Sequence, residues 1–205
     1  MKKLLFATTN KSKINRFYEG LLKKGIELLS LDDLNLNIEV EESGTSAIDN
    51  ALIKARAYQT LVDIPIMAMD DNLFLEGVPD KEQPGTNVRR VGSKRLTDEE
   101  MIKHYTSLVN KYGVNGKITA RWVYGIAIIN KTREYTHTWS KSDFYLVSNP
   151  TEKRDIGYPL NSISINKKLN KYFTDMTEED KISPQEDESD IIDFIASCLE
   201  AKNEF

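Results

Sequence analysis

The sequence predicts an α/β protein whose mixed central sheet is flanked by helices, with two lobes and a cleft between them. Three observations support this class. Strand and helix patterns alternate in the first half of the chain, two long strand patterns dominate the second half, and the chain has 205 residues. Alternating strands and helices favour a sheet covered by helices. A chain of this length can bury one hydrophobic core without disulfides or structural metals, so we expect residues 1–205 to form a single two-lobed domain.

Apolar runs and helical patterns alternate from the N-terminus onward. Leu4 to Ala7 is a short apolar run typical of a buried strand. The apolar spacing that follows predicts a helix ending near Gly25. We expect further strands over residues 26–31 and 38–42, the latter because apolar and acidic residues alternate there.

The next helix leads to a strand that carries two aspartates. Ser46, with Asp49 three residues later, resembles a capping box. The helix that it opens is expected to end before Pro65, because the residue before a proline disfavours the helical conformation. We expect a buried strand over residues 64–69 that ends in Asp70-Asp71.

Paired strands follow in the second half. Residues 76–95 contain several glycines and prolines and predict a long loop. A capping box of Thr97 and Glu100 then opens a helix. Residues 117–130 and 134–147 predict two long strands joined by a tight turn. The last helix is expected to open with Ser183 as its N-cap and Pro184 in its first turn.

Composition excludes several classes of protein. Lys and Arg total 28 against 32 Asp and Glu, a net charge of −4, which argues against a nucleic-acid partner. The single cysteine, Cys198, permits neither an internal disulfide nor a CxxC zinc site and favours a reducing compartment. The apolar run at the N-terminus stops at Ala7, and no stretch approaches the ~20 residues of a membrane helix. We therefore expect a cytoplasmic protein with no membrane partner.

The first polar cluster, residues 8–13, lies at a strand-to-helix junction. Free backbone N–H groups and the positive end of the helix favour an anion there. The hydroxyls, amide and lysines of Thr-Thr-Asn-Lys-Ser-Lys suit a phosphate tail. Simple capping of the helix by Asn10 or Ser12 explains the same residues equally well.

Two acidic pairs follow predicted strands. Glu41-Glu42 precedes a Ser43-Gly44 turn, and Asp70-Asp71 ends the next strand. Carboxylates at the carboxyl edge of a sheet lie where α/β proteins bind ligands, and two such pairs can share a Mg²⁺. Solvated turn residues are the plainer explanation of each pair taken alone.

Taken in chain order, these clusters resemble one family, the inosine triphosphate pyrophosphatases or non-canonical purine NTP pyrophosphatases. The family has a Thr-x-Asn-x-x-Lys turn, Glu-Glu-Thr-Gly and Asn-Ala-x-x-Lys-Ala segments, an Asp-Asp strand end, and a Pro-Gly loop with an arginine six residues past the proline. Order and spacing agree over roughly the first ninety residues. The matching positions are Thr8, Asn10, Lys13, Glu41–Gly44, Asn50–Ala55, Asp70-Asp71, Pro84-Gly85 and Arg90.

The second half departs from the family. Ile156-Gly157-Tyr158-Pro159-Leu160 replaces the family's Phe-Gly-Tyr-Asp-Pro, so the base-stacking aromatic and the aspartate are missing. Ser183-Pro184-Gln185 replaces Ser-His-Arg, which helps to read the 6-oxo edge of the purine in the family. Asn72-Leu73 replaces the Ser-Gly that follows the paired aspartates. The resemblance therefore implies a divergent member that keeps its phosphate and metal half and has a changed base specificity.

The resemblance implies an enzyme, a hydrolase acting on acid anhydrides. It would convert a nucleoside triphosphate to monophosphate and pyrophosphate in the house-cleaning of non-canonical or modified nucleotides. It would need Mg²⁺, for which Mn²⁺ can substitute. Glu42 and Asp70 are the implied metal ligands, and Asp71 is the implied catalytic base or a second metal contact. The implied phosphate-binding residues are Thr8, Asn10, Lys13, Lys54 and Arg90, and the implied base-binding residues are Tyr158, Lys181, Ser183 and Gln185.

Two other interpretations stay open. The first is a degenerate family member that binds nucleotides, or binds a partner, without catalysis. The second is an interaction protein that uses its acidic C-terminal segment. Retention of the three acidic positions argues against the first, and the phosphate turn argues against the second. Since the family pairs its subunits, we expect a homodimer. The strands around Trp122 and Trp139 are the candidate surface, unless both tryptophans belong to the core.

Overall fold

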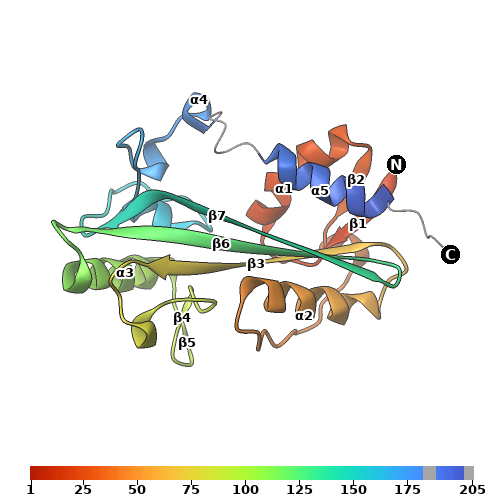
Figure 1. Cartoon of the computed structure of the whole chain (residues 1–205), viewed down its shortest axis with the longest axis horizontal. Helices are drawn as coiled ribbons and strands as arrows, with labels where there is room; N and C mark the ends of the chain where they lie inside the picture. The colour runs from red at the N-terminus through yellow and green to blue at the C-terminus, as the bar shows by residue number, and fades with distance from the viewer. Residues whose placement is uncertain (182–187, 201–205) are drawn as a thin grey trace. The chain divides into compact units, whose positions relative to one another are not determined.

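The structure is a computed structural model of the chain, and it describes residues 1–181 and 188–200. The chain forms two compact units. The first unit holds Met1–Asp70, Tyr124–Trp139 and residues 188–200, and the second holds Asp71–Val123 and residues 140–181. Figure 1 shows the elements of each unit in chain order.

A six-stranded mixed sheet is the centre of the architecture. Its members are β1 (Lys2–Phe6), β2 (Ile26–Leu29), β3 (Ile66–Leu75), β6 (Lys117–Asn130), β7 (Arg133–Val147) and β8 (Ser164–Asn166). They are hydrogen-bonded in the order β2-β1-β3-β6-β7-β8. β1 is parallel to both β2 and β3, whereas β7 is antiparallel to β8. The expected α/β class with a mixed sheet is confirmed.

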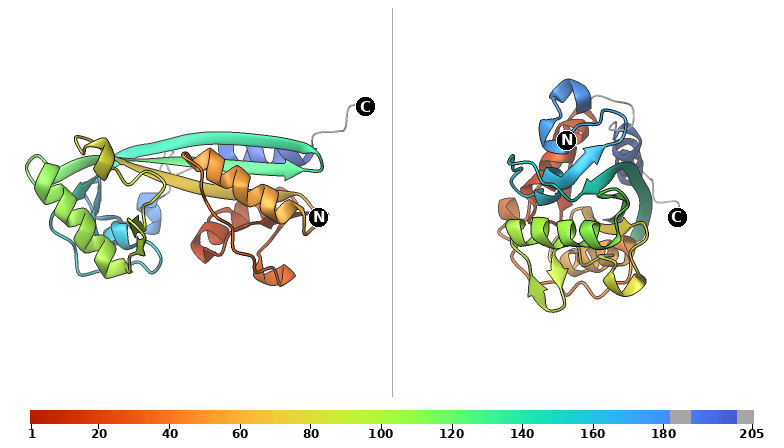
Figure 2. Two further views of the ribbon diagram at one scale, coloured as in Figure 1. Left: turned by 90° about the horizontal axis from the view of Figure 1, so that it is seen from below. Right: turned by 90° about the vertical axis from the view of Figure 1, so that its left-hand side faces the viewer.

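β6 and β7 form the long hairpin that the sequence predicts (Figure 2). Only Lys131 and Thr132 separate the two strands, and a two-residue link permits only antiparallel neighbours. Lys131 adopts a positive φ of 58°, the left-handed conformation that tight hairpin turns need. Trp122 and Trp139, on this hairpin, are both partly buried against hydrophobic cores, which favours the core explanation for the two tryptophans.

Three helices cover the sheet in the first unit. They are α1 (Lys11–Lys23), α2 (Ala47–Gln59) and α5 (Ser189–Glu200). α1 and α5 pack on one face and α2 on the other (Figure 1). The residues of β3 alternate accordingly: Met67 and Met69 join the core under α1 and α5, whereas Ile66 and Ala68 join the core under α2. This alternation follows from the strand geometry, in which successive side chains point to opposite faces.

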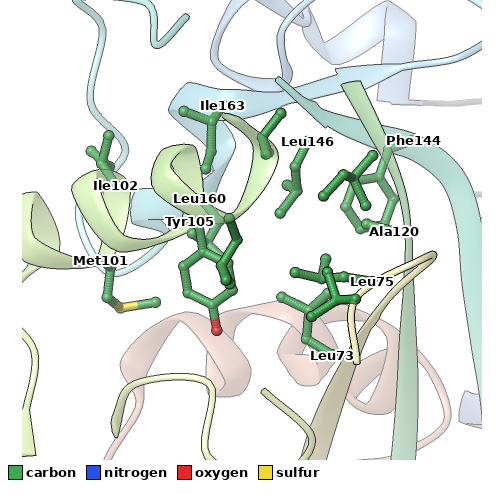
Figure 3. Close-up of a cluster of buried hydrophobic side chains, with 14 of the residues drawn as sticks. Leu73, Leu75, Met101, Ile102, Tyr105, Ala120, Phe144, Leu146, Leu160 and Ile163 are labelled. Carbon is green, nitrogen blue, oxygen red and sulfur yellow. The ribbon is translucent and has the colours of Figure 1, made fainter. Parts of the chain in front are cut away.

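The second unit has a core of its own beneath α3 (Asp98–Tyr112). Figure 3 shows Tyr105 of this helix among the side chains of the strands and of the segment around Leu160. The Tyr105 hydroxyl donates to the carbonyl of Val88 at 2.8 Å, so the ring stays buried with its polar atom satisfied. The remaining short elements are η1 (Asp32–Leu34), η2 (Asp80–Glu82), β4 (Arg90–Val91), β5 (Lys94–Arg95), η3 (Pro159–Ile163), η4 (Phe173–Asp175) and α4 (Glu178–Lys181).

The helix starts agree with the capping patterns. Ser46 and Asp49 exchange side-chain and backbone hydrogen bonds at the start of α2, and Thr97 and Glu100 do the same at α3. The final helix differs, because α5 begins at Ser189. The predicted opening at Ser183 and Pro184 lies outside the described residues. None of the helices in the described part of the chain has the length and apolarity of a membrane span.

Two strand predictions were wrong. The strand that was expected to end in Asp70-Asp71 continues to Leu75 beside β6, and Leu73 also exchanges two backbone hydrogen bonds with Gly85 of the following loop, at 3.0 and 3.1 Å. Residues 38–42 form no strand. Val40 packs against the core under α2, whereas Ile38, Glu41 and Glu42 are exposed, so the alternation does not mark a strand with one buried face.

Candidate active site

The turn between β1 and α1 is built around Asn10. Its side-chain oxygen accepts the backbone N–H groups of Ser12 at 2.9 Å and Lys13 at 3.4 Å, so Asn10 is the N-cap of α1. The Thr8 hydroxyl accepts the backbone N–H of Asn10 at 3.1 Å. The capping explanation for this segment is therefore correct. A role in phosphate binding is compatible with it, because the start of the helix lies at the carboxyl end of a parallel strand.

Lys54 joins the two predicted metal ligands. Its Nζ lies 3.3 Å from Glu42 Oε1 and 3.5 Å from Asp70 Oδ1, and it donates to the Met69 carbonyl at 3.2 Å. The side chains of Lys54 and Asp70 are each 13% exposed, whereas that of Glu42 is 43% exposed. One carboxylate is thus fixed within the protein, and the other lies at the solvent edge of the same cluster.

A buried amide, Asn50, completes the cluster. Its Nδ2 donates to Asp70 Oδ2 at 2.8 Å, and its Oδ1 accepts the backbone N–H of Gly44 at 2.8 Å. From the sequence, Asn50 was matched to the family's Asn-Ala-x-x-Lys-Ala segment but was given no role. A further signal was its spacing from Lys54, because residues four apart on a helix lie on the same face.

Burial dominates the electrostatics of Asp70. It raises the pKa of the carboxyl above its usual value, and the nearby Glu42 carboxylate acts in the same direction. Lys54, Lys13 and the hydrogen bond from Asn50 oppose this rise without cancelling it. The parallel pairing of β1 with β3, in which the Ala7 N–H donates to the Met67 carbonyl at 2.8 Å, brings the start of the β1–α1 turn near the strand segment that carries Asp70. Additional positive charge at this position would stabilise the ionised carboxylate.

The donor set fits a hard divalent cation. Glu42 and Asp70 already point an oxygen each at one positive group, the Lys54 ammonium. Mg²⁺ in phosphate-transfer sites takes one or two carboxylates together with waters and phosphate oxygens. Within residues 1–181 and 188–200, no three His, Cys, Asp or Glu side chains form a metal-binding group. The role of Glu42 and Asp70 as metal ligands stays a prediction with which this geometry is compatible.

The side chains of Asp71 and Asn72, which follow Asp70 in β3, point to opposite faces of the sheet. Asp71 is the next residue of the strand, so its side chain points to the opposite face from that of Asp70. The role of Asp71 stays a prediction. Asn72 returns to the face of Asp70 and is buried, and the described residues offer its Oδ1 no hydrogen-bond partner. Such an acceptor is costly to bury and is available to a water or ligand.

The remaining predicted residues belong to the second unit. Arg90 is exposed in β4, and Tyr158, next to η3, is exposed as well. Lys181 is the last residue of α4. Ser183 and Gln185 lie outside the described residues. The structure thus brings together Glu42, Lys54 and Asp70 beside the turn of Thr8, Asn10 and Lys13, and the base-binding prediction stays untested.

Comparison with known proteins identifies the family. The model described as "Ham1 family" matches residues 4–185. The chain belongs to the Ham1 family. The dITP/XTP pyrophosphatase of Leptospira interrogans is 28% identical over 183 residues, 89% of each chain. Those of Thermoanaerobacter pseudethanolicus (29% over 182 residues, 87% of each chain) and Bacillus subtilis (26% over 203 residues, 98% of each chain) are also similar. The family resemblance of the sequence is confirmed.

Solved Ham1 structures share the fold. The Staphylococcus aureus Ham1 protein superposes with a TM-score of 0.73 at 22% identity, covering 97% of this chain and 98% of that one. A Ham1 protein from Coxiella burnetii gives a TM-score of 0.75 at 20% identity, covering 98% and 100%. The mixed sheet and its helices are therefore the Ham1 fold.

Gly44 is predicted to be irreplaceable by alanine without loss of stability. An added Cβ would lie 2.6 Å from both Asn50 Oδ1 and Asp49 Cβ and 2.9 Å from the Asn50 backbone nitrogen. Because the start of α2 would have to shift, we expect Gly44→Ala to lower the free energy of unfolding by about 1–3 kcal/mol. Urea denaturation measures this change. Ser43→Ala, at an exposed position of the same turn, is the control and should leave the midpoint unchanged. Equal midpoints for both variants would contradict the tight packing at Gly44.

Proposed function

We propose that the protein hydrolyses a nucleoside triphosphate to monophosphate and pyrophosphate, as house-cleaning of non-canonical or modified nucleotides. The observation that carries the proposal is the cluster of Glu42, Lys54 and Asp70 beside the β1–α1 turn of a Ham1-family chain. The family relatives support the reaction class, because those from three bacterial species are named dITP/XTP pyrophosphatases. A hydrolase acting on acid anhydrides is the enzyme class that these names give.

Two carboxylates would hold the metal ion. Glu42 and Asp70 supply the protein oxygens, and the phosphate oxygens of the substrate and water complete the shell. When bound, Mg²⁺, or Mn²⁺ in its place, neutralises phosphate charge and favours formation of a nucleophilic water. Asn50 keeps one oxygen of Asp70 occupied by a hydrogen bond, which leaves the oxygen facing Lys54 for the cation.

The cationic and polar residues bind the triphosphate. Lys54 is available to donate to phosphate oxygens once the two carboxylates have another positive partner. Lys13, the Thr8 hydroxyl and the capped turn at Asn10 lie beside it on the first unit, and Arg90 is the proposed phosphate contact from the second. Fixed positive charge of this kind stabilises phosphoryl transition states by electrostatics. Asp71 is the proposed base, which takes a proton from water as the anhydride bond between the α- and β-phosphates breaks.

The base-binding half is proposed to differ from that of purine-specific relatives. Ile156, which stands in place of the family's aromatic residue, is 95% exposed. Tyr158, Lys181, Ser183 and Gln185 are the proposed base contacts, and a glutamine amide offers both a donor and an acceptor without a charge. We further propose that residues 1–205 act as one domain, and that the functional form is a cytoplasmic homodimer. Light scattering that shows only monomers at high concentration would contradict the dimer.

The first prediction of this proposal is metal-dependent pyrophosphate release. A panel of canonical, deaminated and modified NTPs and dNTPs, assayed with Mg²⁺, Mn²⁺ or EDTA, should show turnover of at least one member with metal and none with EDTA, because two carboxylates add to the negative charge beside the triphosphate and a divalent cation must offset it. No release from any nucleotide at micromolar enzyme would favour the alternative of a member that binds without catalysis.

A second prediction separates the two adjacent glutamates. Glu42→Gln should lower kcat by about 100-fold or more, because it removes a charged oxygen ligand, whereas Glu41→Gln should keep the wild-type rate. Glu41 is the matched control, because it is also exposed and lies one residue away. Asp71→Asn should also abolish turnover without loss of fold, as circular dichroism would verify. If Glu41→Gln were the inactive variant, the metal site would be misassigned.

A third prediction concerns the base. We expect weak discrimination by kcat/KM among ITP, XTP, dUTP and GTP, because strong selectivity requires buried polar groups that the wrong base would leave unpaired. Ser183-Pro184-Gln185 lacks the cations of the family motif. A preference for ITP or XTP of about 100-fold, equivalent to about 3 kcal/mol of transition-state binding, would show that other residues read the purine.

A further inference from the structure

We propose that Asn50 is a positioning residue, whose buried amide fixes both Asp70 and the loop that carries Glu42, so that the two carboxylates face one cation. The identity of that cation rests on the proposed function. The fixing itself rests on geometry alone. Asn50 is 2% exposed, lies one turn into α2, and connects a β-strand residue with a loop residue far from it in sequence.

The two partners determine which way the amide points. Asp70 offers a carboxylate oxygen 2.8 Å from Asn50 Nδ2, and a carboxylate only accepts hydrogen bonds. Gly44 offers a backbone N–H 2.8 Å from Asn50 Oδ1, and this group only donates. A side chain that donates at one end and accepts at the other is therefore required. Aspartate and leucine, which match asparagine in size, each fail at one partner or at both.

The loop that carries Glu42 also contacts the first unit at Val40, which packs on the core under α2, and at Ile38, whose carbonyl accepts the Tyr58 hydroxyl at 3.4 Å. Residues 38–43 contain no helix or strand, and Glu41, Glu42 and Ser43 are all exposed. The hydrogen bond from Gly44 to Asn50 holds the end of this segment against the start of α2. The close approach of Gly44 to Asn50 and Asp49 leaves no space for a side chain, so the backbone is seated directly on the helix. The position of Glu42 two residues earlier depends on this contact.

Asn50 and Lys54 make parallel connections between Asp70 and the loop. Lys54 bridges Asp70 Oδ1 to Glu42 Oε1, and Asn50 bridges Asp70 Oδ2 to the Gly44 backbone. The connection through Lys54 is ionic, so a divalent cation or a phosphate group competes for it. The connection through Asn50 is uncharged and persists when a cation binds. Asn50 therefore holds the two carboxylates in place when Lys54 turns to the substrate.

Asn166 provides a matched control. It is 6% exposed, and its Oδ1 accepts two backbone N–H groups, those of Lys168 and Leu169, each at 2.9 Å. Its Nδ2 donates to an aspartate, Asp143, at 3.4 Å. Asn166→Ala thus removes a buried asparagine with similar partners, from the second unit and without contact to Glu42 or Asp70. A general loss of stability should affect Asn50→Ala and Asn166→Ala alike.

The test combines three measurements on wild type, Asn50→Ala and Asn166→Ala. Hydrogen exchange of residues 41–46 measures how firmly the loop is held. A Mn²⁺ titration without nucleotide, followed by electron paramagnetic resonance, measures the affinity of the carboxylate pair for a cation. The values of kcat and KM measure the effect on the reaction. In Asn50→Ala we expect faster exchange at Gly44, and Mn²⁺ affinity and kcat each lowered by about 10- to 100-fold, with a smaller change in KM. Asn166→Ala should match wild type in all three. Asn50→Ser, whose hydroxyl is too short to reach both partners, should behave as Asn50→Ala if alanine prevents folding.

Failure of the positioning role and failure of the proposed function would give different results. Wild-type exchange at Gly44 in the folded Asn50 variants, or Mn²⁺ affinity and kcat within about twofold of wild type, would overturn the positioning role. Equal losses in Asn166→Ala would overturn it as well, since they would indicate general destabilisation. A wild-type protein that neither binds Mn²⁺ nor releases pyrophosphate would refute the proposed function. In that case the exchange measurement would still decide whether Asn50 holds the loop.

Discussion

A carboxylate buried at Asp70 is the constraint on which the organisation of the first unit depends. Removing an ionised group from water is unfavourable unless hydrogen bonds and opposite charges replace the lost hydration. Here burial still raises the pKa of Asp70, although two lysines and an amide surround it. Each compensating group needs its own support. α2 must present Asn50 and Lys54 on one face, and α1 must begin close to the end of β1 so that Lys13 is near.

The two carboxylates of the site are held in different ways. Asp70 lies inside β3, with core residues before it in the first unit and after it, at Leu73, in the second, so its direction is fixed by the strand. Glu42 lies in a segment without regular structure and depends on contacts to α2. In the proposed function Asp70 would be a rigid ligand and Glu42 an adjustable one, which suits a cation that must also accept phosphate oxygens and water. The capping box at Ser46 fixes where α2 starts, and with it the anchor for the adjustable ligand.

Local patterns predicted most of the fold, and the failures have a common cause. Some features depend only on neighbours in sequence and could therefore be predicted from it. These are the capping boxes at Ser46 and Thr97 and the apolar periodicity of α1. The continuation of β3 past Asp71 lies beside β6, a strand that follows much later in the chain and that no pattern near Asp71 reveals. Residues 38–42 showed the reverse error, since apolar and acidic residues alternate there although no strand forms and Ile38 is exposed. In the site, Asn50 was matched by motif together with the charged residues, whereas its role was recognised only from its two hydrogen bonds.

The bridge that Lys54 forms between Glu42 and Asp70 affects what happens before any ligand arrives. Two carboxylates brought together without a positive partner repel each other, and a flexible loop would carry one of them away. The ammonium acts as a resident counter-ion that cancels this repulsion, so the pair is assembled when the chain folds. The two carboxylates therefore lose their conformational entropy during folding and not during binding, which is the general basis of preorganisation. A divalent ion that enters such a site exchanges with one positive charge and meets ligands that are already in place.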